Sequence, residues 1–313
     1  MSVFVLNKPL GLTSRKTVNL GSQALAVKKV GHAGTLDPLA TGVLILLAGQ
    51  ATKLSPFLSL TTKRYLASVA FGASTLTLDA EGPILDRASA EHITTDAIKD
   101  SLGYFLSLEH QVPPQFSAIK QKGVPSYRSA RKGQTINHAP RPAQYHTITL
   151  IGFYSGHSVL PKFFSPDQNG HWRPADHGFA FNTAKSLGNF PTAIFDLEVS
   201  AGTYARGFAR DLGSILKIPS HLSGLLRTQA GHFTLTQAVS PLNLKSDQGL
   251  SLVNALPYPV VQLEEDETLR VLKGQRLPLQ KNERHSLISP NGHLVAVAEP
   301  SNGRMRLLRV FSG

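Results

Sequence analysis

The segment from Gly31 to Gly42 holds the residue in this chain that is best placed for chemistry. It reads GHAGTLDPLATG and contains a single carboxylate, Asp37, directly before a proline. The proline restricts the backbone of the aspartate, and the glycines on both sides let another chain approach closely. Such a loop could present one carboxylate to a bulky substrate. The same pattern is typical of an Asx turn, which is the more common role of an aspartate beside proline and glycine.

The charges around Asp37 are unusual for a chain of this size. Residues 1–80 contain eight lysines and arginines but only two carboxylates, Asp37 and Asp79. Cations that lie close in space keep an acid ionised, as either a nucleophile or a structural salt bridge requires. Residues 111–142 form a second basic stretch, with six basic residues and no acidic one. The two stretches account for most of the net charge of +12, which suits a nucleic acid but also fits a solvated surface or a membrane surface.

Regular elements are predicted on both sides of the Asp37 loop. Thr13 and Ser14 can cap a helix that runs through about Lys29 and stops at Gly31. Alternating apolar residues predict strands, and apolar residues at helical spacing predict helices. The remaining elements expected in this part of the chain are strands at 65–71 and 195–199 and helices at 98–105, 127–132 and 208–216.

Two later segments have a different character. Residues 155–190 are rich in glycine and proline, contain the only tryptophan, Trp172, and show no periodicity, which predicts an irregular insertion or flexible loop. Beyond about residue 245 the pattern changes to short β segments, with Asn291-Gly292 and Asn302-Gly303 as hairpin turns. Residues 249–313 are therefore expected to form a separate small β domain, and a chain of 313 residues has room for two domains.

Composition excludes several classes of chemistry. The chain has no cysteine, which rules out disulfides, thiol catalysis, iron–sulfur clusters and cysteine-ligated zinc. No glycine-rich nucleotide-binding motif occurs. The first residues lack the basic region of a signal peptide, and no apolar run approaches the roughly 18 residues of a membrane span. We expect a soluble, cytoplasmic protein.

Five ordered sequence blocks resemble the TruB family of tRNA pseudouridine synthases. The loop around Asp37 is similar to the family signature G-H-x-G-x-L-D-P-x-A-x-G, and Lys8 to Ser14 resembles K-P-x-G-x-T-S. The resemblance spans about residues 4 to 233, apart from the insertion. The other three blocks comprise Lys63, Arg64 and Tyr65 with Gly72, Thr75, Thr77, Asp79 and Gly82; Pro113, Pro114, Ser117, Ala118, Lys120, Gly123, Tyr127, Ala130 and Arg131; and Gly202 to Arg206 with Asp211 to Gly213.

The resemblance implies an α+β fold, the pseudouridine synthase fold, with a mixed or antiparallel central sheet flanked by helices. It implies a catalytic domain at residues 1–245 and a C-terminal PUA-like RNA-binding domain at 249–313. The implied activity is isomerisation of a T-loop uridine of tRNA (position 55) to pseudouridine, by base flipping and an aspartate-dependent mechanism. The implied partner is the T-arm of tRNA, with no metal, no cofactor and no obligate protein partner.

The resemblance also implies roles for individual residues. Asp37 is the expected catalytic carboxylate, attacking the uridine or assisting loss of its glycosidic bond, and Arg206 keeps it ionised and oriented. Tyr65 is expected to stack on the uracil and to help move a proton, while His32 takes the place of the base in the RNA stack. The other expected contacts are Tyr204 and Leu225 in the pocket, Lys8 in its wall, and Lys63, Arg64, Lys120, Arg128, Arg131 and Lys132 at RNA phosphates.

The chain departs from the family pattern at a few positions. Ala33 and Thr35 stand where the family more commonly has Thr and Ala, Val199 stands where it often has Cys, and Ala205 stands where it has Ile. Leu226 stands at the first position of a usual arginine pair, leaving Arg227. The loss of this arginine affects one RNA contact or one structural contact rather than the catalytic chemistry.

Two other functions compete with this interpretation. The basic stretches and the β tail would also suit a non-catalytic RNA-binding protein or a tRNA folding chaperone. A missing catalytic residue would favour that alternative, and none is missing. An aspartate-based hydrolase would require a second carboxylate at workable spacing from Asp37, which the sequence lacks.

Overall fold

The computed structural model describes residues 2–121, 124–130, 133–134, 136–184, 187–278, 282–301 and 303–311. Its centre is a mixed sheet with the strand order β1-β3-β16-β4-β15-β11, in which β2 also pairs with β3 and β17 with β16. The pairing of β16 with β3 is parallel, and the other pairings are antiparallel. The strands are β1 (Val3–Lys8), β2 (Val30–Ala33), β3 (Ala40–Ala48), β4 (Lys63–Phe71), β11 (Tyr145–Tyr154), β15 (Thr192–Val199), β16 (Ser220–Ala230) and β17 (Phe233–Thr234). The expected α+β class with a mixed central sheet is confirmed.

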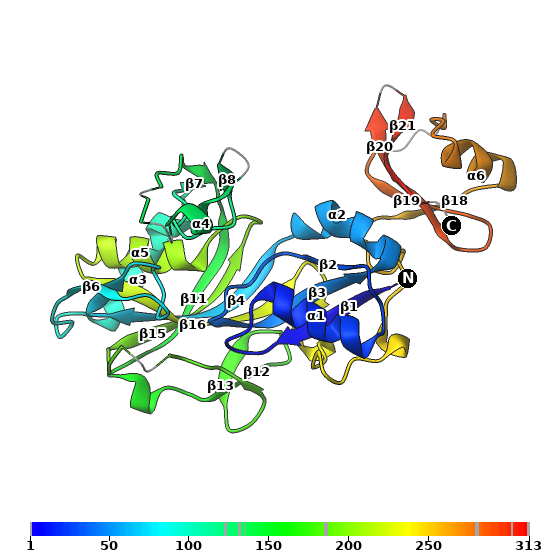
Figure 1. The fold of residues 1–313 in the computed structure, drawn as a ribbon. Coiled ribbons are helices and arrows are strands. Elements are labelled where there is room, and N and C mark those ends of the chain that lie inside the picture. The colour runs from blue at the N-terminus through cyan, green and yellow to red at the C-terminus, as the bar shows by residue number, and fades with distance from the viewer. Residues whose placement is uncertain are drawn as a thin grey trace.

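Helices pack on the sheet along its length (Figure 1). Helix α1 (Ser14–Ala24) buries Val18 with Leu6 and Leu46 of β1 and β3. Helices α3 (Thr95–Leu106) and α5 (Ala205–Ile215) bury aromatic residues, Phe105 and Phe208, against β4, β11 and β15. None of the helices in the described ranges is both long and apolar enough to cross a membrane.

Helix α1 is shorter than the sequence predicts. It ends at Ala24, with Leu25 as its C-cap, because Ala26 leaves the helical path at a left-handed φ of 53°. Gly31 is therefore not the helix stop but the second residue of β2. The predicted loop 31–42 shortens in turn to residues 34–39, since its two ends belong to β2 and β3.

Short elements connect the main ones. The predicted helix at 127–132 is present as α4 (Ser126–Ala130), while residues 131 and 132 lie outside the described ranges. Helix α2 (Ser55–Ser59) follows the 3₁₀ helix η1 (Gly49–Leu54). The other short elements are β5 (Ala73–Thr75), β6 (Ile84–Arg87), β7 (His110–Gln111), β8 (Lys120–Gln121), β9 (Val124–Pro125), β10 (Arg141–Pro142), η2 (His157–Val159), η3 (Leu235–Gln237) and η4 (Ser246–Gln248).

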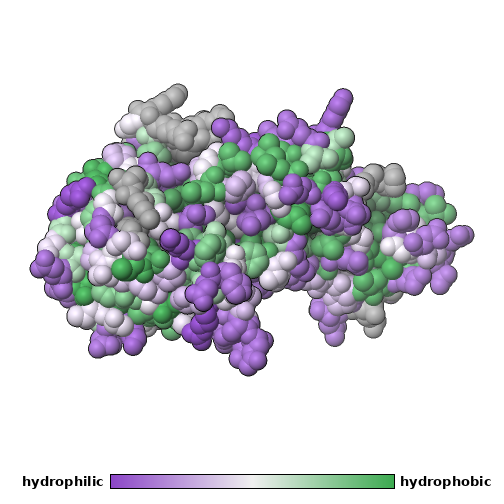
Figure 2. All heavy atoms as spheres, turned by 90° about the horizontal axis from the view of Figure 1, so that it is seen from below, coloured by the Kyte–Doolittle hydropathy of each residue, from purple (hydrophilic) through white to green (hydrophobic). Residues whose placement is uncertain are grey.

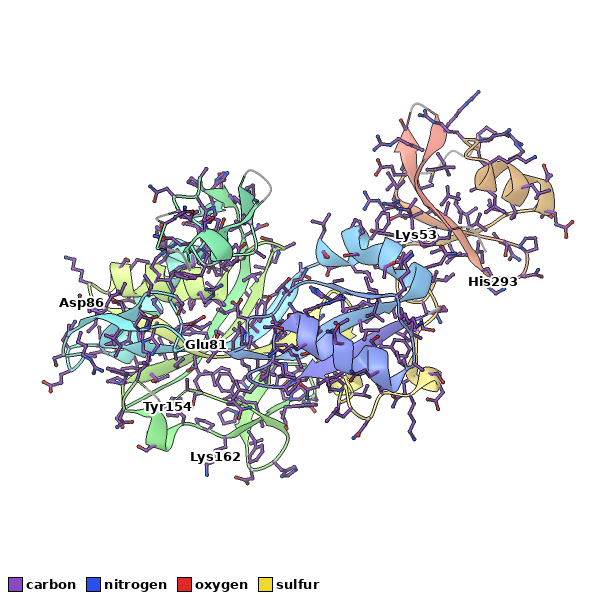
Figure 3. All side chains as sticks on the ribbon, viewed as in Figure 1. Lys53, Glu81, Asp86, Tyr154, Lys162 and His293 are labelled. Atoms are coloured by element: carbon purple, nitrogen blue, oxygen red, sulfur yellow. The ribbon has the colours of Figure 1, made fainter. Side chains whose placement is uncertain are left out.

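The insertion at 155–190 is not an irregular loop, and that prediction is wrong. It forms a three-stranded sheet of β12 (Phe163–Pro166), β13 (Trp172–Ala175) and β14 (Phe179–Ala180), in the order β13-β12-β14. Phe164, Trp172 and Phe181 are buried in one cluster with Leu66 and Leu226 of the central sheet. The insertion thus covers the sheet face opposite α3 and α5, and the sticks of Figure 3 place Tyr154 and Lys162 on this side.

The outer surface of the insertion side is polar in character. Lys162, Arg173 and His177 are exposed there. Figure 2, which views the molecule from this side, shows hydrophilic side chains interrupting the hydrophobic ones. The large apolar residues Phe164, Trp172 and Phe181 of the insertion are by contrast buried, and they form a second cover for the core.

The C-terminal segment forms a sheet of its own, in the order β18-β19-β20-β21, with its own buried cluster. It lies beside α2 (Figure 1), where Lys53 Nζ donates to the carbonyl of Val310 at 3.3 Å and Phe57 meets the ring edge of Tyr258. Gly292, at φ 76°, makes the predicted hairpin turn, whereas Asn302 lies outside the described ranges. The elements are β18 (Val260–Gln262), α6 (Glu265–Leu272), β19 (His285–Ile288), β20 (Leu294–Ser301) and β21 (Arg304–Val310).

Candidate active site

Asp37 lies in the short loop that joins the antiparallel strands β2 and β3. Its side chain is 42% exposed, and its Oδ2 atom is 2.9 Å from Nε of Arg206. The turn itself is closed by the backbone, because the amide of Ala40 donates to the carbonyl of Asp37 at 3.1 Å. The carboxylate is therefore directed at the arginine and at solvent.

Arg206 is buried in the first turn of α5, with 6% of its side chain exposed. Its Nη1 donates to the carbonyl of Thr77 at 3.0 Å, and its Nη2 donates to the carbonyl of Phe116 at 2.9 Å. All three guanidinium nitrogens are thus engaged, so the fork has one orientation. The structure brings Asp37 and Arg206 together as the resemblance implies.

Asp79 is a part of this site that sequence reasoning did not assign. Its Oδ2 lies 3.6 Å from Nε of Arg206, and its Oδ1 accepts from Thr77 Oγ1 at 2.5 Å and from the amide of Glu81 at 3.1 Å. Burial raises the pKa of Asp79 above its usual range, although Thr77 and Arg206 oppose the shift. The shortage of acids in residues 1–80 was the available signal, since both of those acids meet the same arginine.

A cavity of about 270 Å³ opens beside this group. Tyr65 of β4 and Leu225 of β16 line it, and both are nearly buried. Tyr204 enters from the residue before α5, and burial raises the pKa of its hydroxyl. The other lining residues are Gly34, Thr35, Leu36, Asp37, Ser59, Lys63, Ser117, Ala118, Ser200, Gly202, Thr203, Ala205, Arg206 and Arg227.

Gln111 of β7 holds the start of α5 in place, a role without a sequence signal. Its Oε1 accepts from the amide of Tyr204 at 2.9 Å, and its Nε2 donates to the Tyr204 carbonyl at 3.3 Å and to the Tyr145 hydroxyl at 2.9 Å. Gly207 makes room for the amide, because a Cβ there would lie 2.6 Å from Gln111 Nε2. Gln111 therefore fixes the position of the Tyr204 backbone and, through it, of the first turn of α5 that carries Arg206.

Lys8 and His32 flank the Asp37 loop. The Nζ of Lys8 is buried and donates to the carbonyls of Pro9 at 2.8 Å and Pro38 at 3.3 Å, and burial lowers its pKa to about 8. His32 lies half-buried on β2, where burial and the charge of Arg227 lower its pKa. Lys8 thus touches the backbone next to Asp37, whereas His32 is not among the residues that line the cavity.

Two expected phosphate ligands are occupied inside the protein. Lys63 is buried, and its Nζ donates to the carbonyl of Ser59, the last residue of α2, at 2.6 Å and to the carbonyl of Thr61. Arg64 makes a two-pronged ion pair with the buried Asp196, at 2.8 and 2.7 Å. The neighbouring strand β15 brings Asp196 within reach of Arg64, so this guanidinium is a structural group rather than a free phosphate ligand.

The side chains of the remaining phosphate candidates lie outside the described part of the structure. Only the backbone of Lys120, in β8, and of Arg128, in α4, falls within the described part of the chain. Arg131 and Lys132 lie outside it altogether.

Strand β16 divides its side chains between the two faces of the sheet. Leu225 and Arg227 line the cavity, while Leu226 is buried in the cluster that the insertion completes. The buried cluster that Leu226 shares with Phe164 and Phe181 of the insertion explains the leucine, because a charged side chain there would be removed from water. Arg227 is itself buried and donates to the carbonyls of Val43 at 2.6 Å and Thr35 at 3.3 Å.

The site therefore offers one exposed carboxylate held by an arginine, aromatic walls and a cavity on a basic protein. Among the described residues, no group of three histidines, aspartates or glutamates is arranged to hold a metal ion. This arrangement can present an oriented carboxylate to a planar group that enters the cavity lined by Tyr65 and Tyr204.

Comparison with known proteins defines the class. Residues 22–161 match the TruB family pseudouridylate synthase model (N-terminal domain). A solved complex of Cbf5, Nop10 and Gar1 contains a chain of the same fold, with a TM-score of 0.67 and 19% identity over 99% of this chain and 85% of that one. The fold is thus that of the Cbf5 complex chain, and residues 22–161 match a family of pseudouridylate synthases.

Curated relatives narrow the class to one family. The tRNA pseudouridine synthase B of Thermus thermophilus is 41% identical over 100% of this chain and 99% of its own length. That of Deinococcus radiodurans is 39% identical over 100% of both chains. This chain belongs to the TruB family and is therefore a pseudouridine synthase, an isomerase.

Proposed function

We propose that this protein isomerises a uridine in the T-loop of tRNA, at position 55, to pseudouridine in the cytoplasm. The observation that carries the proposal is the ion pair between Asp37 and Arg206 at the edge of a cavity with aromatic walls. The tRNA substrate is the one that the names of the Thermus and Deinococcus relatives state. The T-loop is the site that the resemblance implies.

The target base has to leave the RNA stack before it can reach Asp37. Unstacking costs a few kcal/mol, which contacts in the cavity must offset. Tyr65 and Tyr204 line the cavity and can stack on a base that enters it. His32, on the strand that leads into the loop, would fill the place that the base leaves.

The reaction rearranges the atoms of one nucleotide without adding any. Asp37 attacks the uridine or assists departure of its base, the glycosidic carbon–nitrogen bond breaks, and the base rotates within the cavity. A carbon–carbon bond to the sugar then replaces it, and any bond formed by Asp37 breaks, which returns the free carboxylate. The bonded ring carbon loses its proton with the help of Tyr65, and the ring nitrogen released from the sugar takes up a proton, so the product has the same atoms as the uridine. Arg206 orients Asp37 for the first step, because its guanidinium Nε lies 2.9 Å from the carboxylate.

Residues 1–245 serve as the catalytic domain in this proposal, and residues 249–313 serve as a PUA-like RNA-binding domain. The exposed arginines of β21, Arg304 and Arg309, supply cations for phosphates. Replacing both with alanine should reduce the salt dependence of tRNA binding but leave the rate at saturating tRNA unchanged. An unchanged salt dependence would argue that this segment has another use.

The decisive experiment compares the wild-type protein with Asp37→Asn on an unmodified tRNA transcript, followed by pseudouridine mapping. The wild-type protein should form pseudouridine at the T-loop position, and the variant should bind tRNA and form none. Asp100→Asn, which changes an exposed acid on α3, is the matched control. Turnover by Asp37→Asn near the wild-type rate would overturn the mechanism.

A wild-type protein that bound tRNA without modifying it would favour the non-catalytic RNA-binding or chaperone function. If the protein modified another uridine and left the T-loop unmodified, the proposed activity would stand, but the proposed position in the tRNA would be refuted.

A further inference from the structure

The residue before Asp37 is bound at both of its backbone groups by one hydroxyl. The amide of Leu36 donates to Ser14 Oγ at 2.8 Å, and Ser14 Oγ donates to the carbonyl of Leu36 at 2.9 Å. Ser14 is 2% exposed and Leu36 is 4% exposed, so water does not compete for either group. A single side chain therefore satisfies a buried donor and a buried acceptor, which would each be costly to leave unpaired.

The Ser14 hydroxyl has a fixed position because a helix carries it. Ser14 is the first residue of α1, whose N-terminus is capped by Thr13, since Thr13 Oγ1 accepts from the amide of Lys16 at 3.2 Å. One turn later Val18 is buried against β1 and β3. Because Thr13 performs the capping, the Ser14 hydroxyl is available for the loop.

The bond to the Leu36 carbonyl acts directly on Asp37. That carbonyl belongs to the rigid peptide plane that also contains the nitrogen and Cα of Asp37. Rotation of this plane would swing the Asp37 carboxylate away from Arg206, with which it makes the 2.9 Å contact. Ser14 opposes that rotation from one side of the loop.

Other contacts hold the flanking residues rather than this plane. Arg227 Nη1 donates to the carbonyl of Thr35 at 3.3 Å, and the Pro38 carbonyl accepts from the amide of Gly11 at 2.9 Å and from Lys8 Nζ at 3.3 Å. Without the Ser14 hydroxyl the loop would remain attached at Thr35 and Pro38, while the Leu36 carbonyl would lose the hydrogen bond that holds the Leu36–Asp37 peptide.

We propose that Ser14 is a positioning residue of the isomerisation, which holds the Leu36–Asp37 peptide so that the carboxylate faces both Arg206 and the cavity. The rate part of this inference rests on the proposed function. A displacement of about 1 Å at a reacting group can cost about 100-fold in rate. Ser14→Ala should therefore lower the single-turnover rate at saturating enzyme by about 10- to 100-fold, with the Kd for tRNA within about twofold of wild type.

Two further variants, one at Ser14 and one elsewhere on α1, show whether the effect is specific to the Ser14 hydroxyl. Ser14→Thr retains the hydroxyl and should recover most of the lost rate. Thr17→Val removes another fully buried hydroxyl of α1, one that donates within the helix to the Thr13 carbonyl at 3.2 Å, and should keep the wild-type rate within about twofold. All rates are measured below the melting temperature of each variant.

A second measurement does not depend on activity. Hydrogen exchange of the loop amides, followed by mass spectrometry of a peptide spanning residues 34–39, should be at least about tenfold faster in Ser14→Ala and unchanged in Thr17→Val. Unchanged exchange in Ser14→Ala, or an unchanged rate, would overturn the proposal. An equal loss of rate in Thr17→Val would do so too, because it would show a general effect of α1.

The two measurements separate this inference from the proposed function. If the wild-type protein fails to modify tRNA, the substrate assignment fails. The exchange experiment then still decides whether Ser14 holds the loop.

Discussion

Arg206 and Asp79 meet through the same nitrogen that binds Asp37: Nε of Arg206 lies 3.6 Å from Asp79 Oδ2 and 2.9 Å from Asp37 Oδ2. The Asp79 side chain is 4% exposed, whereas that of Asp37 is 42% exposed. One guanidinium thus joins an inner carboxylate to an outer one. The inner carboxylate is tied to Thr77 and Glu81, so it anchors the arginine from behind and leaves the outer one accessible to substrate.

Asp79→Asn should reduce catalysis without reducing tRNA binding. The variant removes the negative charge behind Arg206 and leaves the guanidinium held by two carbonyls and Asp37. We expect kcat to fall about 10- to 100-fold and the Kd for tRNA to stay within about twofold, because Asp79 is buried away from RNA. Asp86→Asn, on the exposed strand β6 at the outer edge in Figure 3, is the control. A normal kcat in Asp79→Asn would show that Arg206 needs no inner anchor.

Lys8 should make stability depend on pH in the alkaline range. Burial lowers the pKa of Lys8 from 10.5 to about 8 in the folded protein. Between these two values the unfolded chain binds a proton that the folded chain does not, so the free energy of unfolding rises with pH from about 8 to about 10.5. This contribution is lost as the pH falls through the folded pKa.

Urea unfolding of the wild-type protein and of Lys8→Met, at pH 7.5 and 10.5, measures this effect. The wild-type protein should gain about 3 kcal/mol relative to the variant over this interval. Because both proteins contain the same other titrating groups, including Lys63, the contributions of those groups cancel in the difference between the two unfolding free energies. Lys99→Met, which changes a lysine with 61% exposure, should show no such difference. A constant difference between the wild-type protein and Lys8→Met would mean that Lys8 stays charged in the folded state.

Arg64→Ala should affect stability rather than RNA binding. Without Arg64, the buried Asp196 loses both charged hydrogen bonds, and the unpaired carboxylate should cost about 2–3 kcal/mol in the free energy of unfolding. The salt dependence of tRNA binding should remain as in the wild-type protein. The exposed Lys16→Ala is the control for unfolding and should change it little. A flatter salt dependence in Arg64→Ala would restore this residue as a phosphate ligand.

Phe164→Ala should show that the insertion is part of the core. Phe164 is fully buried and meets the ring edge of Phe181 at a centroid distance of 5.3 Å. Its truncation should cost about 3–5 kcal/mol in the free energy of unfolding, while the folded protein keeps its kcat because the insertion lies across the sheet from the cavity. Phe163→Ala, at a partly exposed position of the same strand, should cost clearly less. Equal, small effects of both would indicate that the insertion packs loosely.

The catalytic loop is the part of this protein that its sequence determines most completely. The glycines and the proline around Asp37 act on the backbone of their immediate neighbours, so residue order alone indicates a constrained loop with one carboxylate. The long strands and helices are predictable for a similar reason, since burial of one face repeats at a regular spacing over many residues. The insertion escapes this rule, because its strands are only two to four residues long and carry too few repeats.

Only the tertiary structure decides which distant groups meet at the loop. Ser14 lies 22 residues from Leu36, and Gln111 lies 93 residues from Tyr204, so neither hydrogen bond leaves a local pattern. Arg64 and Lys8 carry the positive charge that suits an RNA ligand. Strand register instead pairs Arg64 with Asp196, and burial leaves Lys8 bound to the carbonyl of Pro38. Residue type states what a side chain can bind. The packing of β3, β4, β16 and α5 determines what it does bind, because hydrogen bonds and ion pairs depend on distances that only the folded chain sets.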